Sequence, residues 1–392
     1  MSATGTIVTF TNLFPSSALP RHGLFVKERM QRVASALAAP WQVVCPVPLV
    51  PRLLRHRAAD RVFAAMPVEE VVDGVRISHP RYRHVPGFSM RRQAERMVDG
   101  ARETIARLCA ARPVVIDAHY VYPDGVAALR LAAELGVPCF VTARGSDINV
   151  LAQDPRIAEQ IRAAVATATR LFAVGEPLAR AFAQVAGVAP SRVEVVRNGV
   201  DLERFRPGDR RQARAQLGLP EGVALVAGVG RLVRGKGFHL MARALRHLPE
   251  AVHFAVAGDG PEREVLSTLA PPERLHLLGT RSPDDVATLL RASDVLVLPS
   301  ENEGWPNVVT EALASGVPVV ATPVGAVPEM LSSPLAGALI RNGDPAVLAR
   351  EVGRILGAPR DRNALSAWAR RFDWSAPVEK LCAAFREAFR VA

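Results

Sequence analysis

The sequence is poor in lysine, cysteine and aromatic residues, and it has no long apolar run. Of its 392 residues, only three are lysines, four are cysteines and 5% are aromatic. No stretch approaches the roughly 18–20 uninterrupted apolar residues of a membrane-spanning helix. The cysteines lie far apart without the spacing of metal ligands, which argues against a zinc site or a disulfide framework. The few aromatic residues and the lack of a recognisable binding module argue against nucleic acid as a partner.

These absences, together with the start of the chain, predict a cytoplasmic protein. The segment "MSATGTIVTFTNLF" has no basic region ahead of an apolar core, so we expect a first buried strand here rather than a signal peptide. A hydrophobic content of 49% with 22% charged residues is typical of globular chains, and the length is sufficient for two domains with separate cores. We expect a soluble protein in a reducing compartment.

The net charge of +11 is carried almost entirely by arginine, and much of the excess lies between Arg52 and Arg112. One interpretation is a solvated, arginine-rich surface. The alternative is attraction to an anionic membrane surface or to a substrate that carries phosphate. The second interpretation places the protein at the inner face of the cell membrane as a peripheral protein.

Short apolar runs alternate with amphipathic segments along the whole chain, which predicts an α/β fold with doubly wound parallel sheets. One series of strands runs from "TIVTF" to "VEVV", and a second begins at "VALVAGVGRL". The segment "LERFRPGDRRQARAQLGLPEG" between them has no strand pattern, so it marks a junction between domains. We expect domains over residues 1–198 and 199–370, and an amphipathic helix over 371–392 that packs back across the junction.

The segment "GRLVRGKG", Gly230 to Gly237, resembles the phosphate-binding loop of nucleotide triphosphatases. Gly237, however, stands where that loop has the serine or threonine that holds magnesium. We therefore expect a glycine-rich turn between a strand and a helix, in which Arg231, Lys236 and backbone N–H groups hold a diphosphate. The alternative is a glycine turn with incidental surface charges.

Two acids, Glu303 and Glu311, lie eight positions apart in "SENEGWPNVVTEALASGVPVVA". Pro306 suits a first helical turn, so Glu303 precedes a predicted helix and Glu311 lies inside it. A carboxylate does not bind phosphate, but it accepts two hydrogen bonds from neighbouring hydroxyls of a sugar or ribose. The pair therefore indicates one acid for each hydroxylated end of a nucleotide sugar, although each acid alone could be an ordinary helix or surface charge.

The quoted segments resemble the retaining glycosyltransferases of family 4, which have the GT-B fold of two Rossmann-like domains with a cleft between them. The resemblance rests on "EGWPNVVTEALASGVPVVAT", "GAVPE", "GRLVRGKG", "AGDGP" and "NGVDLERF" in the family's order. "RGSDIN" and "DAHYVYPDG" bring the chain close to the branch that includes enzymes of bacterial polysaccharide and teichuronic acid assembly. The resemblance covers essentially the whole chain.

The resemblance implies donor-binding roles for residues of the second domain. Arg231 and Lys236 would neutralise the donor diphosphate, Glu311 would hold the ribose, and Glu303 would hold the transferred sugar. The remaining implied donor contacts are Gly230, Gly279, Arg281, Gly304, Trp305, Pro306 and Asn307. The resemblance implies no metal or other cofactor, and the sequence has no Asp-x-Asp motif.

In the first domain, the resemblance places His119 near the reacting centre and Ser146 and Asp147 on the acceptor side. Gly23 matches a glycine-rich loop against the diphosphate, but "LPRHGLF" has one glycine where the family has a pair. His119 could instead be a structural histidine after a buried strand, and Asp147 could cap the following helix.

The expected partners are a nucleotide-diphosphate sugar and a glycan or lipid-linked acceptor. Glycoside hydrolysis is the poorer interpretation, because a hydrolase needs no diphosphate-binding turn. Two further functions stay open: a sugar-nucleotide epimerase or phosphorolytic enzyme, and a binding module that has lost turnover.

Overall fold

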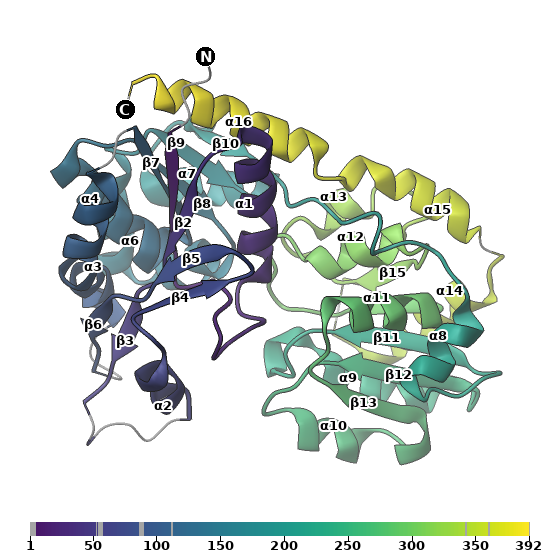
Figure 1. Ribbon diagram of the computed structural model, residues 1–392. Helices are drawn as coiled ribbons and strands as arrows, with labels where there is room; N and C mark the ends of the chain where they lie inside the picture. The colour runs from purple at the N-terminus through teal and green to yellow at the C-terminus, as the bar shows by residue number, and fades with distance from the viewer. Residues whose placement is uncertain are drawn as a thin grey trace. The chain divides into compact units, whose positions relative to one another are not determined.

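The computed structural model describes residues 5–51, 53, 58–85, 90–110, 113–341, 343–359 and 361–391 (Figure 1). The chain forms two compact units. The described residues of Met1–Asn198 and Ser375–Ala392 form unit 1, and those of Gly199–Trp374 form unit 2. Each unit is a sheet covered by helices, as the alternating sequence pattern predicts.

Unit 1 is built on one large sheet. In spatial order its strands are β10 (Val193–Val195), β9 (Arg170–Ala173), β8 (Cys139–Ala143), β7 (Val114–His119), β1 (Thr6–Phe10), β2 (Trp41–Val44), β5 (Val75–Ser78) and β4 (Glu69–Val72). The central strands β7, β8 and β1 are apolar and buried because helices cover both faces of the sheet. β3 (Val47–Leu49) and β6 (Arg81–Arg83) form a separate parallel pair.

One edge of the unit 1 sheet departs from the predicted parallel pairing, which holds for the rest of the sheet. β4 pairs antiparallel with β5, while the other neighbours in this sheet are parallel. Asp73 and Gly74 connect the two strands with φ angles of 49° and 79°. Positive φ at both positions is the geometry of a tight hairpin turn, for which Asp-Gly is a preferred sequence.

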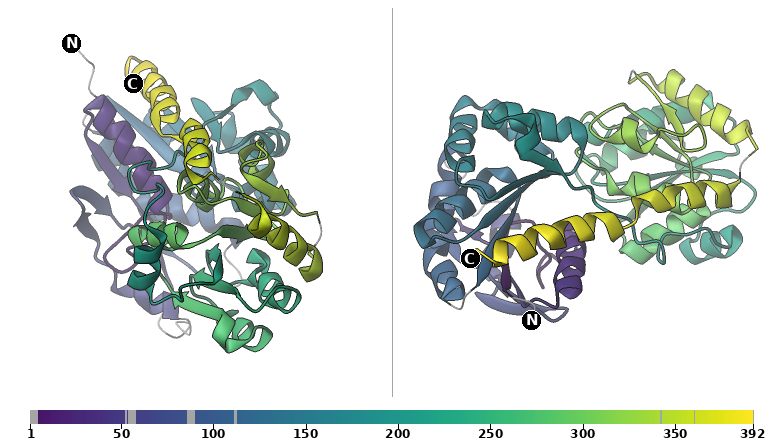
Figure 2. Two further views of the ribbon diagram at one scale, coloured as in Figure 1. Left: turned by 90° about the vertical axis from the view of Figure 1, so that its right-hand side faces the viewer. Right: turned by 90° about the horizontal axis from the view of Figure 1, so that it is seen from above.

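Helices surround the sheet of unit 1, and one of them comes from the end of the chain (Figures 1 and 2). α16 (Ser375–Phe389) packs on α1 (Leu24–Leu37), and the Phe385 ring lies 4.9 Å from that of Phe140 in β8. The other helices of the unit are α2 (Ala58–Ala65), α3 (Gln93–Cys109), α4 (Val126–Leu135), α5 (Ser146–Asn149), α6 (Pro155–Val165) and α7 (Glu176–Ala186).

Unit 2 contains a sheet of six parallel strands. Their spatial order is β13 (Leu275–Gly279), β12 (Val252–Ala257), β11 (Ala224–Val229), β14 (Val295–Leu298), β15 (Val319–Ala321) and β16 (Gly337–Leu339). One face packs against α9 (Phe238–Ala244), α10 (Arg263–Leu269) and α14 (Pro345–Gly357). The other helices are α8 (Arg210–Leu217), α11 (Pro283–Ala292), α12 (Asn307–Ala314), α13 (Val327–Met330) and α15 (Arg362–Ala369).

The predicted junction segment contains a helix of unit 2. α8 lies within "LERFRPGDRRQARAQLGLPEG", begins after Asp209, whose carboxylate accepts from Gln212 N, and ends at Gly218 with a φ of 64°. The many arginines of α8 gave the segment no apolar pattern, although the helix has a buried face that includes Ala213 and Arg214. Among the described residues, none of the helices is long and apolar enough to cross a bilayer.

Candidate active site

The predicted donor-binding residues of unit 2 lie on loops that follow the carboxyl ends of its strands. Because all six strands are parallel, these loops leave the same edge of the sheet. Gly230 and Arg231 follow β11, Gly279 ends β13, and Glu303 follows β14. Lys236 ends a 3-10 turn, Arg234–Lys236, that leads into α9.

The structure brings Lys236 and Glu303 into direct contact. Nζ of Lys236 donates to Oε1 of Glu303 at 2.6 Å, and the two side chains are 26% and 10% exposed. This ion pair joins the loop after β11 to the loop after β14. The sequence did not predict it, because the two residues were expected at different parts of a ligand. An ammonium group has three N–H donors, so Lys236 keeps donors for a phosphate while it holds Glu303.

The turn after β11 offers side chains to an anion. It does not offer the backbone N–H groups of Leu232, Val233, Lys236 and Gly237. Those four N–H groups donate to backbone carbonyl oxygens, so they are already used within unit 2. The Arg231 side chain is exposed at this edge. The cationic groups are therefore the part of the prediction that the geometry still allows.

Gly237 has a structural reason to be glycine. Its φ angle is 70°, and a Cβ atom at this position would lie 2.0 Å from the carbonyl oxygen of Pro299. A serine or threonine of a magnesium-binding phosphate loop does not fit there without moving the backbone. The structure thus supports the exclusion of that loop.

The segment from Glu303 to Glu311 is held by its neighbours. Gly304 O accepts from Ala326 N at 3.1 Å, and a Cβ at Gly325, whose φ is 53°, would lie 2.1 Å from Glu303 O. The "GAVPE" motif therefore supports the loop that carries Glu303. Glu311 is the fifth residue of α12 and is partly exposed.

Pro306 differs from its predicted place by one residue. Its ψ angle of 100° is extended, so it precedes α12, which begins at Asn307. Proline also has no N–H group, so Pro306 cannot take part in the predicted row of backbone donors. Trp305 is 7% exposed, and its ring meets that of Phe372 edge-on at 6.1 Å. The Trp305 ring thus belongs to the packing of unit 2.

Gly279 and Arg281 lie in the loop after β13. Gly279 has a φ of 71°, and its carbonyl oxygen accepts from Gly258 N at 2.8 Å, which joins the ends of β12 and β13. Nε of Arg281 donates to Leu278 O at 3.0 Å. The predicted contact of this loop with a nucleobase stays a prediction.

In unit 1, His119 lies at the end of β7 in a buried polar network. Nη2 of Arg144 donates to its Nδ1 at 2.7 Å, and its Nε2 lies 2.8 Å from Oδ2 of Asp117. Because a guanidinium only donates, Nδ1 must accept and the ring is neutral with its hydrogen on Nε2. Burial is the main cause that lowers the pKa of His119 to about 4, and Arg144 and Arg29 lower it further.

Two further residues complete this network. Asn198 Oδ1 accepts from Nη1 of Arg144 at 3.0 Å and from Nη2 of Arg29 at 2.9 Å. Arg29 also donates to Val196 O at 2.6 Å, and burial lowers its pKa to about 10. The network favours the structural interpretation that the sequence left open for His119, whose side chain is 1% exposed.

The carboxylate of Asp147 is used inside unit 1. Oδ1 accepts from Gly145 N at 2.7 Å, and Oδ2 accepts from Val121 N at 2.8 Å. Asp147 thus holds the loops after β7 and β8 together and does not cap the helix that follows it. Burial raises the pKa of Asp147 despite these bonds. Ser146, its neighbour, has its Oγ 2.6 Å from the hydroxyl oxygen of Tyr120.

Gly23 precedes α1 with a φ of 67°. A Cβ atom there would lie 2.1 Å from Leu13 O, so this glycine is required by the close approach of two backbone segments. Asp124, which the sequence left without a role, is fully buried and accepts from Asn12 N, in the loop between β1 and α1. Burial raises the pKa of Asp124 well above its usual range.

Comparison with known proteins supplies the family. The model of the family "Glycosyl transferases group 1" matches residues 209–372, and that of "Glycosyltransferase Family 4" matches residues 30–204. A Bacillus subtilis protein named as a putative teichuronic acid biosynthesis glycosyltransferase is 32% identical over 326 residues, 82% of this chain and 82% of that protein. The D-inositol 3-phosphate glycosyltransferase of Mycobacterium tuberculosis is 37% identical over 237 residues, 56% of this chain and 49% of that protein.

Solved structures share the architecture. Sucrose-phosphate synthase of Thermosynechococcus elongatus superposes with a TM-score of 0.76 at 20% identity, covering 99% of this chain and 100% of that one. The Anabaena protein HepE, in complex with UDP-glucose, superposes with a TM-score of 0.71 at 20% identity, covering 97% and 99%. The predicted GT-B fold of two Rossmann-like domains is confirmed. The chain belongs to family 4 of the glycosyltransferases, and it is a glycosyltransferase.

Proposed function

We propose that the protein transfers a sugar from a nucleotide-diphosphate donor to a hydroxyl of a glycan or lipid-linked acceptor, with retention of configuration. The proposed setting is the assembly of a cell-surface polysaccharide or glycolipid, at the inner face of the membrane. The relative from Bacillus subtilis, named for teichuronic acid biosynthesis, supports this setting. HepE, solved with UDP-glucose, supports a nucleotide sugar as the donor.

The observation that carries the proposal is the contact between Lys236 and Glu303 at the carboxyl edge of the unit 2 sheet. A cation and a carboxylate 2.6 Å apart present two different kinds of group to one ligand. The ammonium group suits a diphosphate, and the carboxylate suits sugar hydroxyls. A nucleotide sugar has both groups, and they meet at the carbon where transfer takes place.

In the proposed reaction, the bond between the anomeric carbon and the diphosphate oxygen breaks, and the acceptor oxygen bonds to that carbon. The acceptor proton goes to the leaving diphosphate. Lys236 and Arg231 would offset the negative charge that grows on this leaving group. Glu303 would orient the sugar, and Glu311 would hold the ribose. No metal or other cofactor forms part of the proposal.

Replacing Lys236 tests the proposal. UDP-, GDP- and ADP-sugars are first screened for thermal stabilisation of the full chain, and release of nucleoside diphosphate is measured with the best donor. We expect Lys236→Ala to lower kcat/KM by about 100- to 1,000-fold, the loss typical of one group that stabilises transition-state charge. Lys27→Ala, which removes a lysine of an ion pair with Asp73 in unit 1, should leave turnover unchanged.

The outcomes distinguish transfer from the competing functions. Wild-type turnover in Lys236→Ala would refute the diphosphate assignment. Donor binding without release of nucleoside diphosphate would indicate a binding module. A change in the sugar of the donor without its transfer would indicate an epimerase.

The proposed contact with an anionic membrane rests on the arginines between Arg52 and Arg112. Those two residues lie outside the described part of the chain, and several others pair with acids. Examples are Arg102 with Glu134 and Arg107 with Glu69. The membrane contact stays a prediction.

A further inference from the structure

Unit 2 has a cavity at the amino edge of its sheet, opposite the edge that carries Lys236 and Glu303. The cavity has a volume of about 470 Å³, within the roughly 300–1,000 Å³ typical of sites for small molecules. Its walls come from the residues just before β11, β14 and β15, from α8, and from Leu356, Ala358 and Arg362. β11 has six residues, so the two edges lie about 20 Å apart. The cavity is therefore separate from the proposed donor site.

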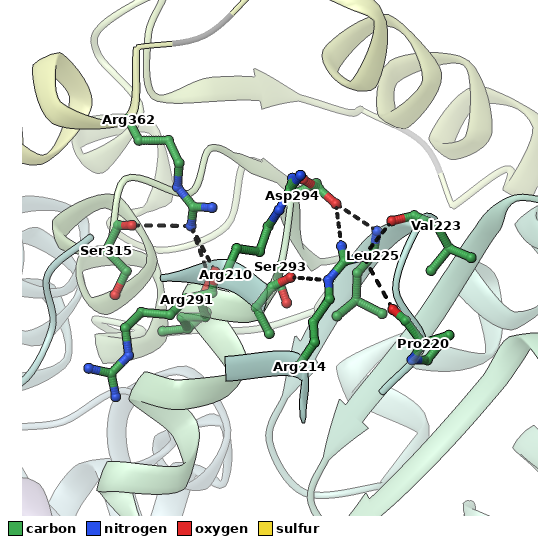
Figure 3. Close-up of polar contacts among 12 residues, drawn as sticks. Arg210, Arg214, Pro220, Val223, Leu225, Arg291, Ser293, Asp294, Ser315 and Arg362 are labelled. Carbon is green, nitrogen blue, oxygen red and sulfur yellow. Dashed lines mark hydrogen bonds and ion pairs between the residues drawn. The ribbon is translucent and has the colours of Figure 1, made fainter. Parts of the chain in front are cut away.

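Three arginines and one aspartate line the cavity: Arg210, Arg214, Arg362 and Asp294 (Figure 3). Asp294 lies between two of the arginines. Its Oδ1 accepts from Arg210, and its Oδ2 accepts from Nη2 of Arg214 at 3.0 Å and from Leu225 N at 2.9 Å. With three guanidinium groups and one carboxylate, the side chains of the wall carry a surplus of positive charge.

The three arginines have different structural roles. Arg214 is 3% exposed and bonds to the carbonyl oxygens of Ala292, Pro220 and Val223, which fastens α8 to the starts of two strands. Arg214 thus stabilises the packing of α8 against the sheet. The Arg210 side chain, in contrast, is 52% exposed and pairs with Asp294.

Arg362 approaches from the first position of α15. Its Nη2 lies 3.3–3.4 Å from the carbonyl oxygens of Leu290, Arg291 and Ser315. Figure 3 shows Arg362 beside Arg291 and Ser315. These distances exceed the usual 2.7–3.2 Å, so the three bonds are individually weak. An anion that accepts from Arg210 and Arg362 would make shorter, charge-assisted bonds than these carbonyls do.

The rest of the wall is partly apolar. Pro318, Leu356 and Ala358 line the cavity beside the arginines. A smaller cavity of about 120 Å³ adjoins it and shares Gly316, Pro318 and Ala358. The space exceeds that of a bare phosphate ion, so an organic group attached to the phosphate can bury surface against these residues.

We propose that this cavity binds a small phosphate monoester, whose phosphate group pairs with Arg210 and Arg362 and whose organic group lies against Pro318 and Leu356. Arg214 and Asp294 hold the wall in place. Inorganic phosphate shares the charged chemistry but not the organic group, so it should bind more weakly. The inference is independent of the proposed donor site.

Calorimetric titration of the full chain tests this proposal. Glucose 6-phosphate, inorganic phosphate and glucose serve as probes at constant ionic strength, and each titration is made in the wild type and in Lys236→Ala, in which the donor site contributes little. We expect glucose 6-phosphate to bind more tightly than phosphate, and glucose not to bind. Arg210→Gln should weaken the binding of glucose 6-phosphate about 10- to 100-fold, the effect of one charge-assisted hydrogen bond.

Arg211→Gln is the matched control. Arg211 is the next residue of α8, its side chain is 83% exposed, and it pairs with Glu221 outside the cavity. This substitution makes the same change in net charge as Arg210→Gln and should leave affinity unchanged. Arg362→Lys keeps the positive charge but loses the paired N–H donors of the guanidinium, so it should weaken binding less than Arg362→Gln does. The thermal unfolding of each variant shows whether it is folded.

Three results would overturn the proposal. The first is the absence of binding by glucose 6-phosphate and phosphate in the folded protein. The second is an equal loss in Arg211→Gln and Arg210→Gln, which would mean general attraction to a basic surface. The third is binding in the wild-type chain that Lys236→Ala abolishes, which would place the ligand at the donor site.

Discussion

The carboxyl strand ends of the two units hold their polar side chains in different ways. In unit 1, His119 and Asp147 are buried and Arg144 is half-buried; Arg144 bonds to His119, and Asp147 bonds to backbone N–H groups. In unit 2, Lys236 and Glu303 lie on loops, are partly exposed and meet in one ion pair. A buried network is fixed before any ligand arrives, whereas a partly exposed ion pair on two loops can exchange partners more readily. We therefore expect substitutions at these residues of unit 1 to lower mainly stability, and substitutions at those of unit 2 to lower mainly activity.

The largest effect on stability should come from Arg144. Arg144→Met removes the donor to His119 Nδ1, which then has no partner, while Asn198 Oδ1 still accepts from Arg29. We expect a loss of about 1–3 kcal/mol in the free energy of unfolding, the cost typical of a buried polar group that loses its hydrogen-bond partner. Denaturant unfolding followed by circular dichroism measures it.

Arg102→Met is the matched control for this prediction. Arg102 is 50% exposed and pairs with Glu134, so its loss should cost less than about 1 kcal/mol. Equal stability of the two variants would contradict the view that the network in unit 1 is a structural support.

The pH dependence of stability should identify His119. Its pKa falls from 6.5 to about 4 on folding, so between these values the unfolded chain binds a proton that the folded chain does not. The free energy of unfolding therefore falls as the pH falls through this window, by about 3 kcal/mol in total at about 1.4 kcal/mol per pH unit. Asp124 and Asp147, whose raised pKa values act in the opposite direction, remain in both proteins.

The measurement compares the wild type with His119→Gln between pH 7 and pH 4.5. The variant should lose less stability on acidification than the wild type does. Parallel curves would mean that His119 is already protonated in the folded chain or gains no proton on unfolding.

The smallest effects should separate the two acids of unit 2. Glu311→Gln should weaken the binding of the nucleoside diphosphate about tenfold. Glu303→Gln should weaken the binding of the nucleotide sugar about tenfold, and the binding of the nucleoside diphosphate less than that. Glu301→Gln, at an exposed neighbouring position, should change neither affinity. Calorimetric titration with both ligands gives the four dissociation constants. Equal losses of both ligands in both variants would contradict the proposed division between sugar and ribose.

The apolar runs were sufficient to predict most strands of both sheets. A buried parallel strand is a mostly apolar segment, and "TIVTF", "VVIDAH" and "VLVL" became β1, β7 and β14. The pattern was weaker where one face of an element is exposed. β4, with alternating exposure, and the arginine-rich α8 carry no such run, although the Asp73–Gly74 pair could have indicated the hairpin.

The sequence named candidate site residues singly, but it could not predict their contacts. Lys236 and Glu303 stand 67 positions apart, and Arg29 lies 169 positions from Asn198. No local spacing encodes such pairs, because the topology of the sheet decides which loops meet. The cavity bounded by Arg210 and Arg362 was missed for the same reason.

The position of α16 also bears on how the protein is made. The core of unit 1 includes Leu381, Phe385 and Phe389, which the ribosome adds after all of unit 2. Unit 2 has its core within Gly199–Trp374 and needs no residue of α16 to complete it. The earlier part of unit 1, in contrast, must wait with the apolar surface under α16 uncovered. During synthesis, the half of the protein that begins first is therefore the half that finishes last.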